Sequence, residues 1–198
     1  TGVQMMIGLP GDDDATLFKS TREAASLAPD YARIYPLLVL KGSPLESDFR
    51  NGRYIPLHLE KGVELAAGMV RIFESHQARV IRIGLQASEG LEDPSIVLAG
   101  PWHPSFGHLV FSRLVFEQTC RAVDRFLAPL NSKPQTLILS VHPRTESRLK
   151  GDKQANMDRL SRIYPGIQFK VARTDSLAPD RVTVSLPQSC PKSLDKRR

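Results

Sequence analysis

The sequence predicts an α/β fold, and two observations support this. From residue 3 to residue 85, strand-like apolar runs alternate with segments of helical periodicity in the order strand–helix–strand–helix–strand. That order is the signature of βα units and a parallel sheet. After a linker at residues 131–134, a shorter βααββ series follows. With 198 residues, the chain has room for an α/β domain and a small additional domain.

The first strand is expected at Val3–Ile7 and ends in Gly8-Leu9-Pro10-Gly11. Three aspartates at 12–14 then offer a helix N-cap and first-turn carboxylates, which the helix dipole favours. Residues 31–40 are apolar at nearly every second position and densely apolar in between, which predicts one parallel strand buried on both faces. The remaining elements expected in this part are a short helix at 45–51, a longer helix at 59–76 and a strand at 79–85.

An irregular stretch is expected at residues 89–104, followed by an amphipathic helix at 105–127. The last series is expected to comprise strands at 136–141, 167–171 and 181–186, helices at 144–149 and 155–163, and a turn at 151–154. The predicted domains are 1–104, a connecting helix at 105–130, a small basic domain at 131–186 and a disordered tail at 187–198.

Charge is distributed unevenly along the chain. Residues 1–100 hold 10 Lys/Arg and 13 Asp/Glu, a net charge of −3, whereas residues 101–198 hold 17 and 8, a net charge of +9. A basic half of this kind can face a polyanion such as RNA. The other interpretation, which composition alone favours, is a solvated basic surface with a basic tail.

Cysteine usage and hydropathy indicate a cytoplasmic protein without a membrane partner. No apolar run reaches 18 residues, and no signal peptide is recognisable. The two cysteines, Cys120 and Cys190, fit no zinc or iron–sulfur spacing, so we expect a buried thiol and a tail thiol and no metal site. The chain begins at Thr1 and enters a strand almost at once, from which we expect that an upstream part is absent.

Polar residues accompany the expected strand ends, where ligands bind in parallel sheets. The glycines of Gly8-Leu9-Pro10-Gly11 fit a ligand-approaching loop or, as the plainer alternative, a tight turn between strand and helix. The other polar candidates near strand ends are Gln4, Tyr35, Lys41, Arg82, Gln86 and His103. No residue is assigned a catalytic role, because no nucleophile elbow, phosphate loop or His-Glu-x-x-His motif is present.

A family resemblance rests on several separate segments. The stretch Arg33-Ile34-Tyr35-Pro36, an apolar run, Lys41-Gly42-Ser43 and then Gly52-Arg53-Tyr54 is very similar to the catalytic subunit of Elongator. Val3–Pro10 resembles the radical S-adenosylmethionine (SAM) strand that ends in Gly-Leu-Pro, which also occurs in oxygen-independent coproporphyrinogen oxidases. Residues 80–86 and 99–104 are similar to bacterial Elongator-like radical SAM proteins.

The resemblance implies the C-terminal segment of a partial (β/α) barrel that binds SAM beside a 4Fe–4S cluster. In such enzymes, reductive cleavage of SAM gives a radical that abstracts hydrogen from a substrate. The residues expected near SAM are Gln4, Met6, Gly8, Leu9 and Pro10. The residues expected on the substrate side are Tyr35, Lys41, Arg82, Gln86 and His103.

The chain departs from the family pattern in two respects. It lacks the Cys-x-x-x-Cys-x-x-Cys motif that holds the cluster, and nothing after Ser105 resembles the acetyltransferase domain of the Elongator subunit. We therefore expect the cluster ligands to lie in a separate N-terminal half of the barrel. The alternative function is a non-catalytic RNA-binding or structural module.

The βααββ series resembles a KH-type fold, in which a Gly-x-x-Gly loop between two helices grips the nucleic-acid backbone. The loop here is Gly151-Asp152-Lys153-Gln154, so Gln154 replaces the second glycine. The resemblance assigns RNA contact to Arg148, Lys150, Gly151 and Lys153. The alternative is a small structural domain that does not bind RNA.

Overall fold

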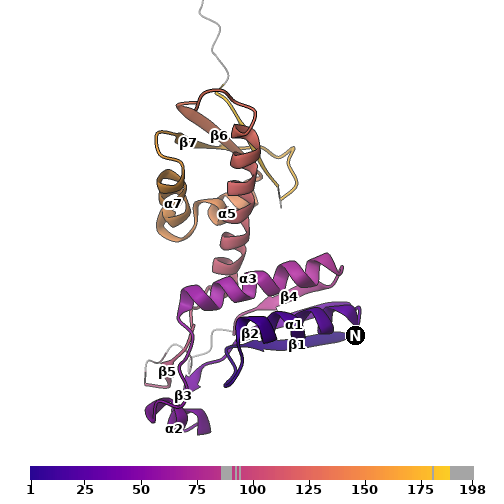
Figure 1. The fold of residues 1–198 in the computed structure, drawn as a ribbon, viewed down its shortest axis with the longest axis vertical. Coiled ribbons are helices and arrows are strands. Elements are labelled where there is room, and N and C mark those ends of the chain that lie inside the picture. Colours follow the sequence, from indigo (N-terminus) through magenta and orange to yellow (C-terminus); the bar gives the residue numbers. More distant parts are fainter. Residues whose placement is uncertain (86–90, 92, 94, 180, 188–198) are drawn as a thin grey trace, which may run out of the picture. The chain divides into compact units, whose positions relative to one another are not determined.

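The computed structural model describes residues 1–85, 91, 93, 95–179 and 181–187. The chain divides into two compact units, Thr1–Leu114 and Val115–Arg198. The predicted α/β class is confirmed, because strands and helices occur in both units (Figure 1). Among the described residues, no helix combines the length and apolar character needed to cross a membrane.

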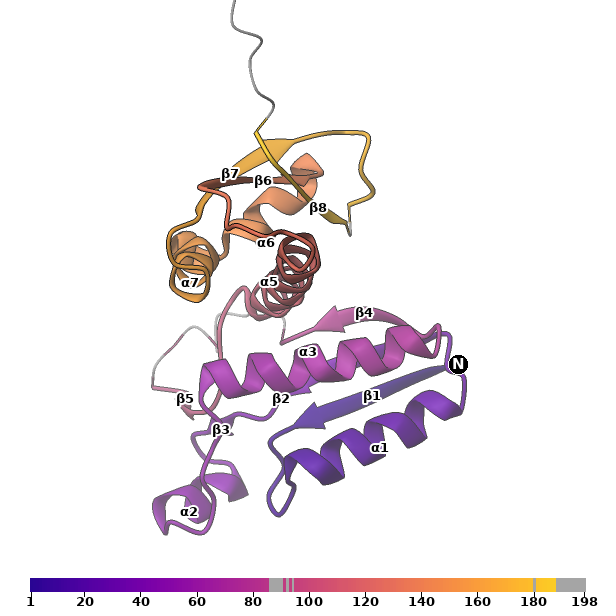
Figure 2. The ribbon, with the colours of Figure 1, turned by 45° about the horizontal axis from the view of Figure 1, so that its top comes forward.

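A parallel three-stranded sheet with the order β1-β2-β4 organises the first unit. Its strands are β1 (Gly2–Ile7), β2 (Tyr31–Pro36) and β4 (Arg79–Ile83). Helices α1 (Asp14–Ser26) and α3 (Leu59–Ser75) connect them and lie on the same side of the sheet (Figure 2). The predicted strand–helix–strand–helix–strand order is therefore confirmed.

Helix α1 begins as the aspartate run predicts. Asp13 is the N-cap, and its carboxylate accepts a 2.7 Å hydrogen bond from the backbone N–H of Thr16. This hydrogen bond lowers the pKa of Asp13, because the N–H stabilises the ionised carboxylate. The helix then packs closely on α3, where Gly68 leaves room for the ring of Phe18.

Apolar side chains from the helices and from one face of the sheet form the core of the first unit. Ile7, Ala32 and Ile34 face this core from β1 and β2, and α3 buries nine residues, among them Phe73. The first turns of α5 (Phe106–Leu127) also contribute, through Phe106 and Val110. The helices α1 and α3 thus cover one face of the sheet.

The prediction of a single strand at residues 31–40 was wrong. The segment divides into β2, which ends at Pro36, and β3 (Val39–Leu40), which pairs antiparallel with β5 (Val97–Ala99) in a separate sheet. Proline has no N–H with which to extend a ladder. The pairing of β2 with β4 ends at Ile34, opposite Ile83, and its pairing with β1 ends at Pro36, opposite Ile7. Because both pieces are apolar, the sequence pattern did not reveal the break.

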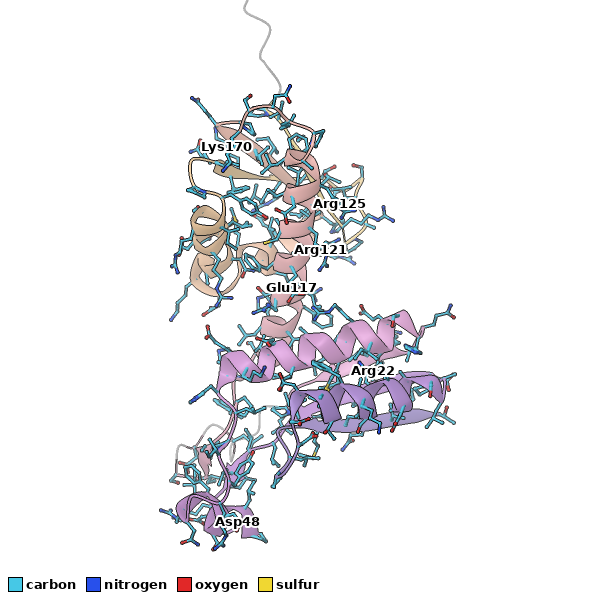
Figure 3. The ribbon with its side chains drawn as sticks, viewed as in Figure 1. Arg22, Asp48, Glu117, Arg121, Arg125 and Lys170 are labelled. Atoms are coloured by element: carbon cyan, nitrogen blue, oxygen red, sulfur yellow. The ribbon has the colours of Figure 1, made fainter. Side chains whose placement is uncertain are left out.

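Strand β5 also corrects the prediction of an irregular stretch at residues 89–104. This strand has only three residues, too few for an alternating pattern to be recognised. The short helix expected at 45–51 is present as α2 (Pro44–Arg50), next to β3. Its side chains, including Asp48, can be followed in Figure 3.

The second unit contains a mixed sheet of order β7-β6-β8. β6 (Thr136–Val141) is central, parallel to β7 (Gln168–Arg173) and antiparallel to β8 (Val182–Ser185). Between β6 and β7 the chain forms a 3-10 turn (Pro143–Thr145), α6 (Glu146–Lys150), a second 3-10 turn (Asp152–Gln154) and α7 (Ala155–Ile163). The expected βααββ order is present.

The division between the two units falls inside α5. Residues near its start join the core of the first unit, whereas Val115, Phe116 and Val123 join that of the second. The helix therefore belongs to both cores along its length. The predicted tail at 187–198 lies outside the described residues apart from Pro187.

Candidate ligand-binding face

The sheet of the first unit presents a polar row on the face away from its helices. Register pairs Gln4 with Arg33 and Arg33 with Arg82, so the three side chains stand side by side across β1, β2 and β4. A bulge at Ile81 shifts the register of β4 by one residue, so that Arg82 rather than Ile81 pairs with Arg33. Two residues further along the strands, Met6 pairs with Tyr35 on the same face.

This arrangement brings together residues that the sequence assigns to two different ligands. Gln4 and Met6 are predicted to lie near SAM, and Tyr35 and Arg82 near a substrate. Their neighbours in each strand, such as Met5 and Ile34, face the core instead. Because side chains alternate along a strand, the four candidates share one face.

A surface hollow of about 510 Å³ lies between the outer edge of β1 and helix α1. It is lined by Gln4, Met5, Met6, Leu9, Pro10, Gly11, Asp12, Leu17 and Ser20. The hollow therefore contains four of the five residues expected near SAM, and Gly8 lies next to Leu9 in the chain. Backbone polar groups of β1 not paired with β2 face the same edge.

The Gly-Leu-Pro segment is anchored at the end of β1 by Tyr54. The Tyr54 hydroxyl donates a 2.6 Å hydrogen bond to the carbonyl oxygen of Gly8. Tyr54 is buried, which raises the pKa of its hydroxyl and keeps it a donor. Gly8 adopts φ +84°, and a Cβ there would lie 3.0 Å from the Leu57 side chain. The turn at Gly8 thus depends on glycine.

Lys41 and His103 do not join the polar row. Lys41 follows β3, and its backbone N–H donates to the carbonyl of Ile96 in the small antiparallel sheet. His103 precedes α5, and its Nδ1 accepts a 3.0 Å hydrogen bond from the N–H of Ser105. This contact gives His103 a helix-capping role in the structure. Gln86 lies outside the described residues.

The chain offers no ligand set for an iron–sulfur cluster. A cluster of this kind is held by several thiolates, and the sequence has only Cys120 and Cys190. Burial raises the pKa of the Cys120 thiol, which disfavours the thiolate. Within the part of the chain that the structure describes, no three His, Cys, Asp or Glu side chains come together as a metal-binding group. Cys190 lies outside that part.

In the second unit, the loop between α6 and α7 has an unusual backbone. Gly151 has φ +76°, Lys153 has φ +46° and Gln154 has φ +67°. Gln154 thus takes the left-handed conformation that a second glycine would take without strain. Asn156 is buried beneath the loop, and its amide donates a 3.1 Å hydrogen bond to the carbonyl of Arg148.

The basic residues predicted to contact RNA differ in their surroundings. The Lys150 ammonium lies 2.6 Å from a carboxylate oxygen of Glu146, which also binds Arg173. These two cations lower the pKa of Glu146 to about 2, Arg173 more strongly than Lys150. Lys153 is exposed at the tip of the loop. Its charge is therefore better placed than that of Lys150 to meet an external anion.

Two contributors to the face were not among the residues predicted for the site, although both lie in the quoted motifs. Arg33 precedes Ile-Tyr-Pro, and Tyr54 ends Gly-Arg-Tyr. The strand alternation that places Tyr35 on the face also places Arg33 there, so periodicity could have identified Arg33. Nothing in the local pattern indicates that Tyr54 contacts Gly8, which lies 46 residues earlier.

Comparison with known proteins gives two partial matches. Residues 29–115 match the family described as the Radical_SAM C-terminal domain. A 64-residue segment is 36% identical to a tRNA uridine(34) acetyltransferase of Methanocaldococcus jannaschii. That alignment covers 31% of this chain and 12% of the relative, so the chain spans only a small fraction of that protein's length. The resemblance predicted from the sequence is thereby confirmed, and the chain is similar over part of its length to radical SAM proteins of the Elongator-like type.

Proposed function

We propose that the first unit forms part of the ligand-binding wall of a radical SAM enzyme. The observation that carries this proposal is the placement of Gln4 and Met6 beside the hollow at the end of β1. The family match at residues 29–115 supports the same chemistry. In the intact enzyme, SAM would supply a 5′-deoxyadenosyl radical that takes hydrogen from the substrate.

The proposed roles follow the arrangement of the sheet. Gln4 offers an amide to the ribose of SAM, and Met6 offers its backbone to the adenine. Gly8, Leu9 and Pro10 form the turn past which the adenosine lies.

Tyr35 and Arg82, on the neighbouring strands, contact the substrate. We also propose Lys41, Gln86 and His103 for the substrate side, because each lies in one of the segments that resemble Elongator-type radical SAM proteins.

The residues of this chain do not fit the 4Fe–4S cluster, because they provide at most two cysteines. We therefore propose that the cluster ligands and the strands that complete a partial barrel come from an N-terminal part. The contribution of this chain is to bind, orient and shield the ligands.

Calorimetry of SAM binding to the 198-residue chain tests the proposal. We expect weak binding that Gln4→Ala weakens about fivefold, the equivalent of losing one hydrogen bond of about 1 kcal/mol. Gln168→Ala, an exposed glutamine on β7, is the matched control and should leave binding unchanged. Absence of binding, or equal binding by both variants, would contradict the SAM site.

Anaerobic treatment with iron and sulfide tests the assignment of the cluster ligands. We expect no cluster absorbance from this chain alone, because three nearby thiolates are needed. Cluster formation by the chain alone would show that the ligands have been wrongly placed outside it.

A second candidate function is RNA contact by a KH-like second unit. The specific observation is the loop between α6 and α7, in which Lys153 and Gln154 have positive φ values and Lys153 is exposed. The two helices connect the parallel strands β6 and β7. The relative from Methanocaldococcus jannaschii is named for a tRNA substrate, which supports RNA as the partner. The proposed RNA contacts are Arg148, Lys150, Gly151 and Lys153. Lys150 should contribute less to the affinity for RNA, because its ammonium is paired with Glu146.

Binding of fluorescent transfer RNA to the chain tests this second function. Lys153→Glu should reduce affinity severalfold, with a steep dependence on salt. Lys170→Glu, on β7 (Figure 3), is the control with the same change of charge. Equal losses in both variants would indicate non-specific attraction to a basic surface rather than binding by the loop.

A further inference from the structure

Two arginines stand opposite each other on the helix-free face of the first sheet. Arg33 on β2 and Arg82 on β4 are register partners and point to the same side. Adjacent strands lie about 4.8 Å apart, so the bases of the two side chains are close neighbours. Like charges in this position repel each other and destabilise a sheet.

Neither arginine has an acidic partner among the described residues. Both are absent from the ion pairs formed there, whereas Arg50 and Arg53 in the same unit each bind a carboxylate. The contact that Arg33 makes is with the ring of Tyr31, whose centroid lies 5.7 Å from its guanidinium carbon. A cation–π contact leaves the edge of the guanidinium, with its N–H donors, free to bind.

Arg33 is held in place by an arrangement that begins at Gly2. A Cβ at Gly2 would lie 2.2 Å from a ring atom of Tyr31, so the ring lies directly over this glycine. Gly2 and Tyr31 are register partners on β1 and β2. The absence of a side chain at position 2 thus permits the ring position that supports Arg33.

We propose that Arg33 and Arg82 together bind an oxyanion, either a carboxylate or a phosphate, with the Gln4 amide as an additional donor. Gln4 pairs with Arg33 from the other side, so the three donors form one row across the sheet. Paired guanidinium groups match the two oxygens of such anions. The inference deepens the proposed function by naming the chemical group of the ligand, and it rests on that function only in taking this face as the ligand-binding one.

NMR titration of the 198-residue chain tests the site through the arginine Nε–Hε signals. The probes are inorganic pyrophosphate, which offers phosphate oxygens, and SAM, which offers a carboxylate. We expect the signals of both Arg33 and Arg82 to shift with at least one probe. A response to pyrophosphate alone identifies a phosphate as the group bound, and a response to SAM alone identifies the carboxylate.

Arg33→Gln and Arg82→Gln should each weaken binding of the active probe about tenfold. Arg22→Gln on α1 (Figure 3), on the opposite side of the sheet, removes the same charge and should not change the affinity. The proposal is overturned if neither probe moves the two signals, or if Arg22→Gln weakens binding as much. This test needs neither a cluster nor turnover. Its failure would therefore not contradict the radical SAM assignment, which the SAM-binding and cluster experiments described above test separately.

Tyr31 is a positioning residue in this site, which gives a second, independent measurement. Tyr31→Ala should weaken binding severalfold and broaden the Arg33 Nε signal, whereas Tyr31→Phe should restore both because it keeps the ring. Weakening by Tyr31→Phe equal to that by Tyr31→Ala would show that the ring does not hold Arg33.

Discussion

The hydroxyl of Tyr54 donates a 2.6 Å hydrogen bond to the carbonyl oxygen of Gly8, across 46 residues of sequence. This bond joins the Gly-Arg-Tyr segment to the Gly-Leu-Pro segment, two motifs that the sequence shows only as separate features. The Tyr54 ring is buried, and the positive φ of Gly8 directs the chain away from β1 beside it. The bond therefore fixes where the strand ends and where the proposed SAM turn begins.

Tyr54→Phe should lower the free energy of unfolding by about 1 kcal/mol, because it removes this hydrogen bond and leaves a carbonyl without its partner. Urea denaturation measures the change. Tyr31→Phe is the matched control, since it removes a hydroxyl from a partly exposed ring and should have little effect. Equal stability of the two variants would show that the bond contributes nothing to the turn.

Gly68→Ala should destabilise the first unit by overpacking the contact between α1 and α3. A Cβ at this position would lie 2.5 Å from a ring carbon of Phe18, so a side chain or helix must move. Overpacking of this kind costs about 1–3 kcal/mol. Thermal unfolding measures the loss.

Combining Gly68→Ala with Phe18→Leu tests that explanation, because the smaller side chain relieves the contact. The double variant should be more stable than the sum of the two single changes predicts. Strict additivity would show that the cost of Gly68→Ala comes from some other contact.

Glu146 should make the stability of the second unit sensitive to acid. Its pKa is lowered from its ordinary value of 4.5 to about 2 by Arg173 and Lys150, so folding favours the ionised form. The stabilisation is complete above about pH 4.5, and it is lost as the pH falls toward 2. Glu146→Gln should therefore reduce the melting temperature near pH 6 and show a smaller further loss between pH 4.5 and pH 2.

Melting temperatures measured across this pH range, with Asp158→Asn as the control on the exposed side of α7, check the prediction. If the Glu146→Gln protein loses as much stability in acid as the unchanged protein, other carboxylates govern its response to acid.

The sequence predicted the parallel β1-β2-β4 arrangement because alternation of apolar runs and helical periodicity is a local signal. It failed at residues 31–40, where β2 ends at Pro36 together with its pairing to Ile7 of β1. The shared face of Gln4, Tyr35 and Arg82 follows from strand alternation and could be predicted once the strands were known. The capping role of His103 and the anchoring role of Tyr54 arise from contacts across loops, for which the sequence carries no periodic signal.

Gly151→Ala should destabilise the second unit more than Gly166→Ala. Both glycines have positive φ values, of +76° and +85°, but Gly151 also has ψ 173°, in a region that is essentially restricted to glycine. A Cβ at Gly166 meets nothing within 4 Å, so its cost is the backbone strain of about 1–2 kcal/mol. At Gly151, a Cβ would also lie 2.9 Å from the Asn156 side chain, which is buried and donates to the carbonyl of Arg148. The added clash would displace this amide and with it the loop that carries Lys153. Denaturant unfolding of the two variants measures the difference, and equal losses would show that the loop conformation does not depend on Asn156.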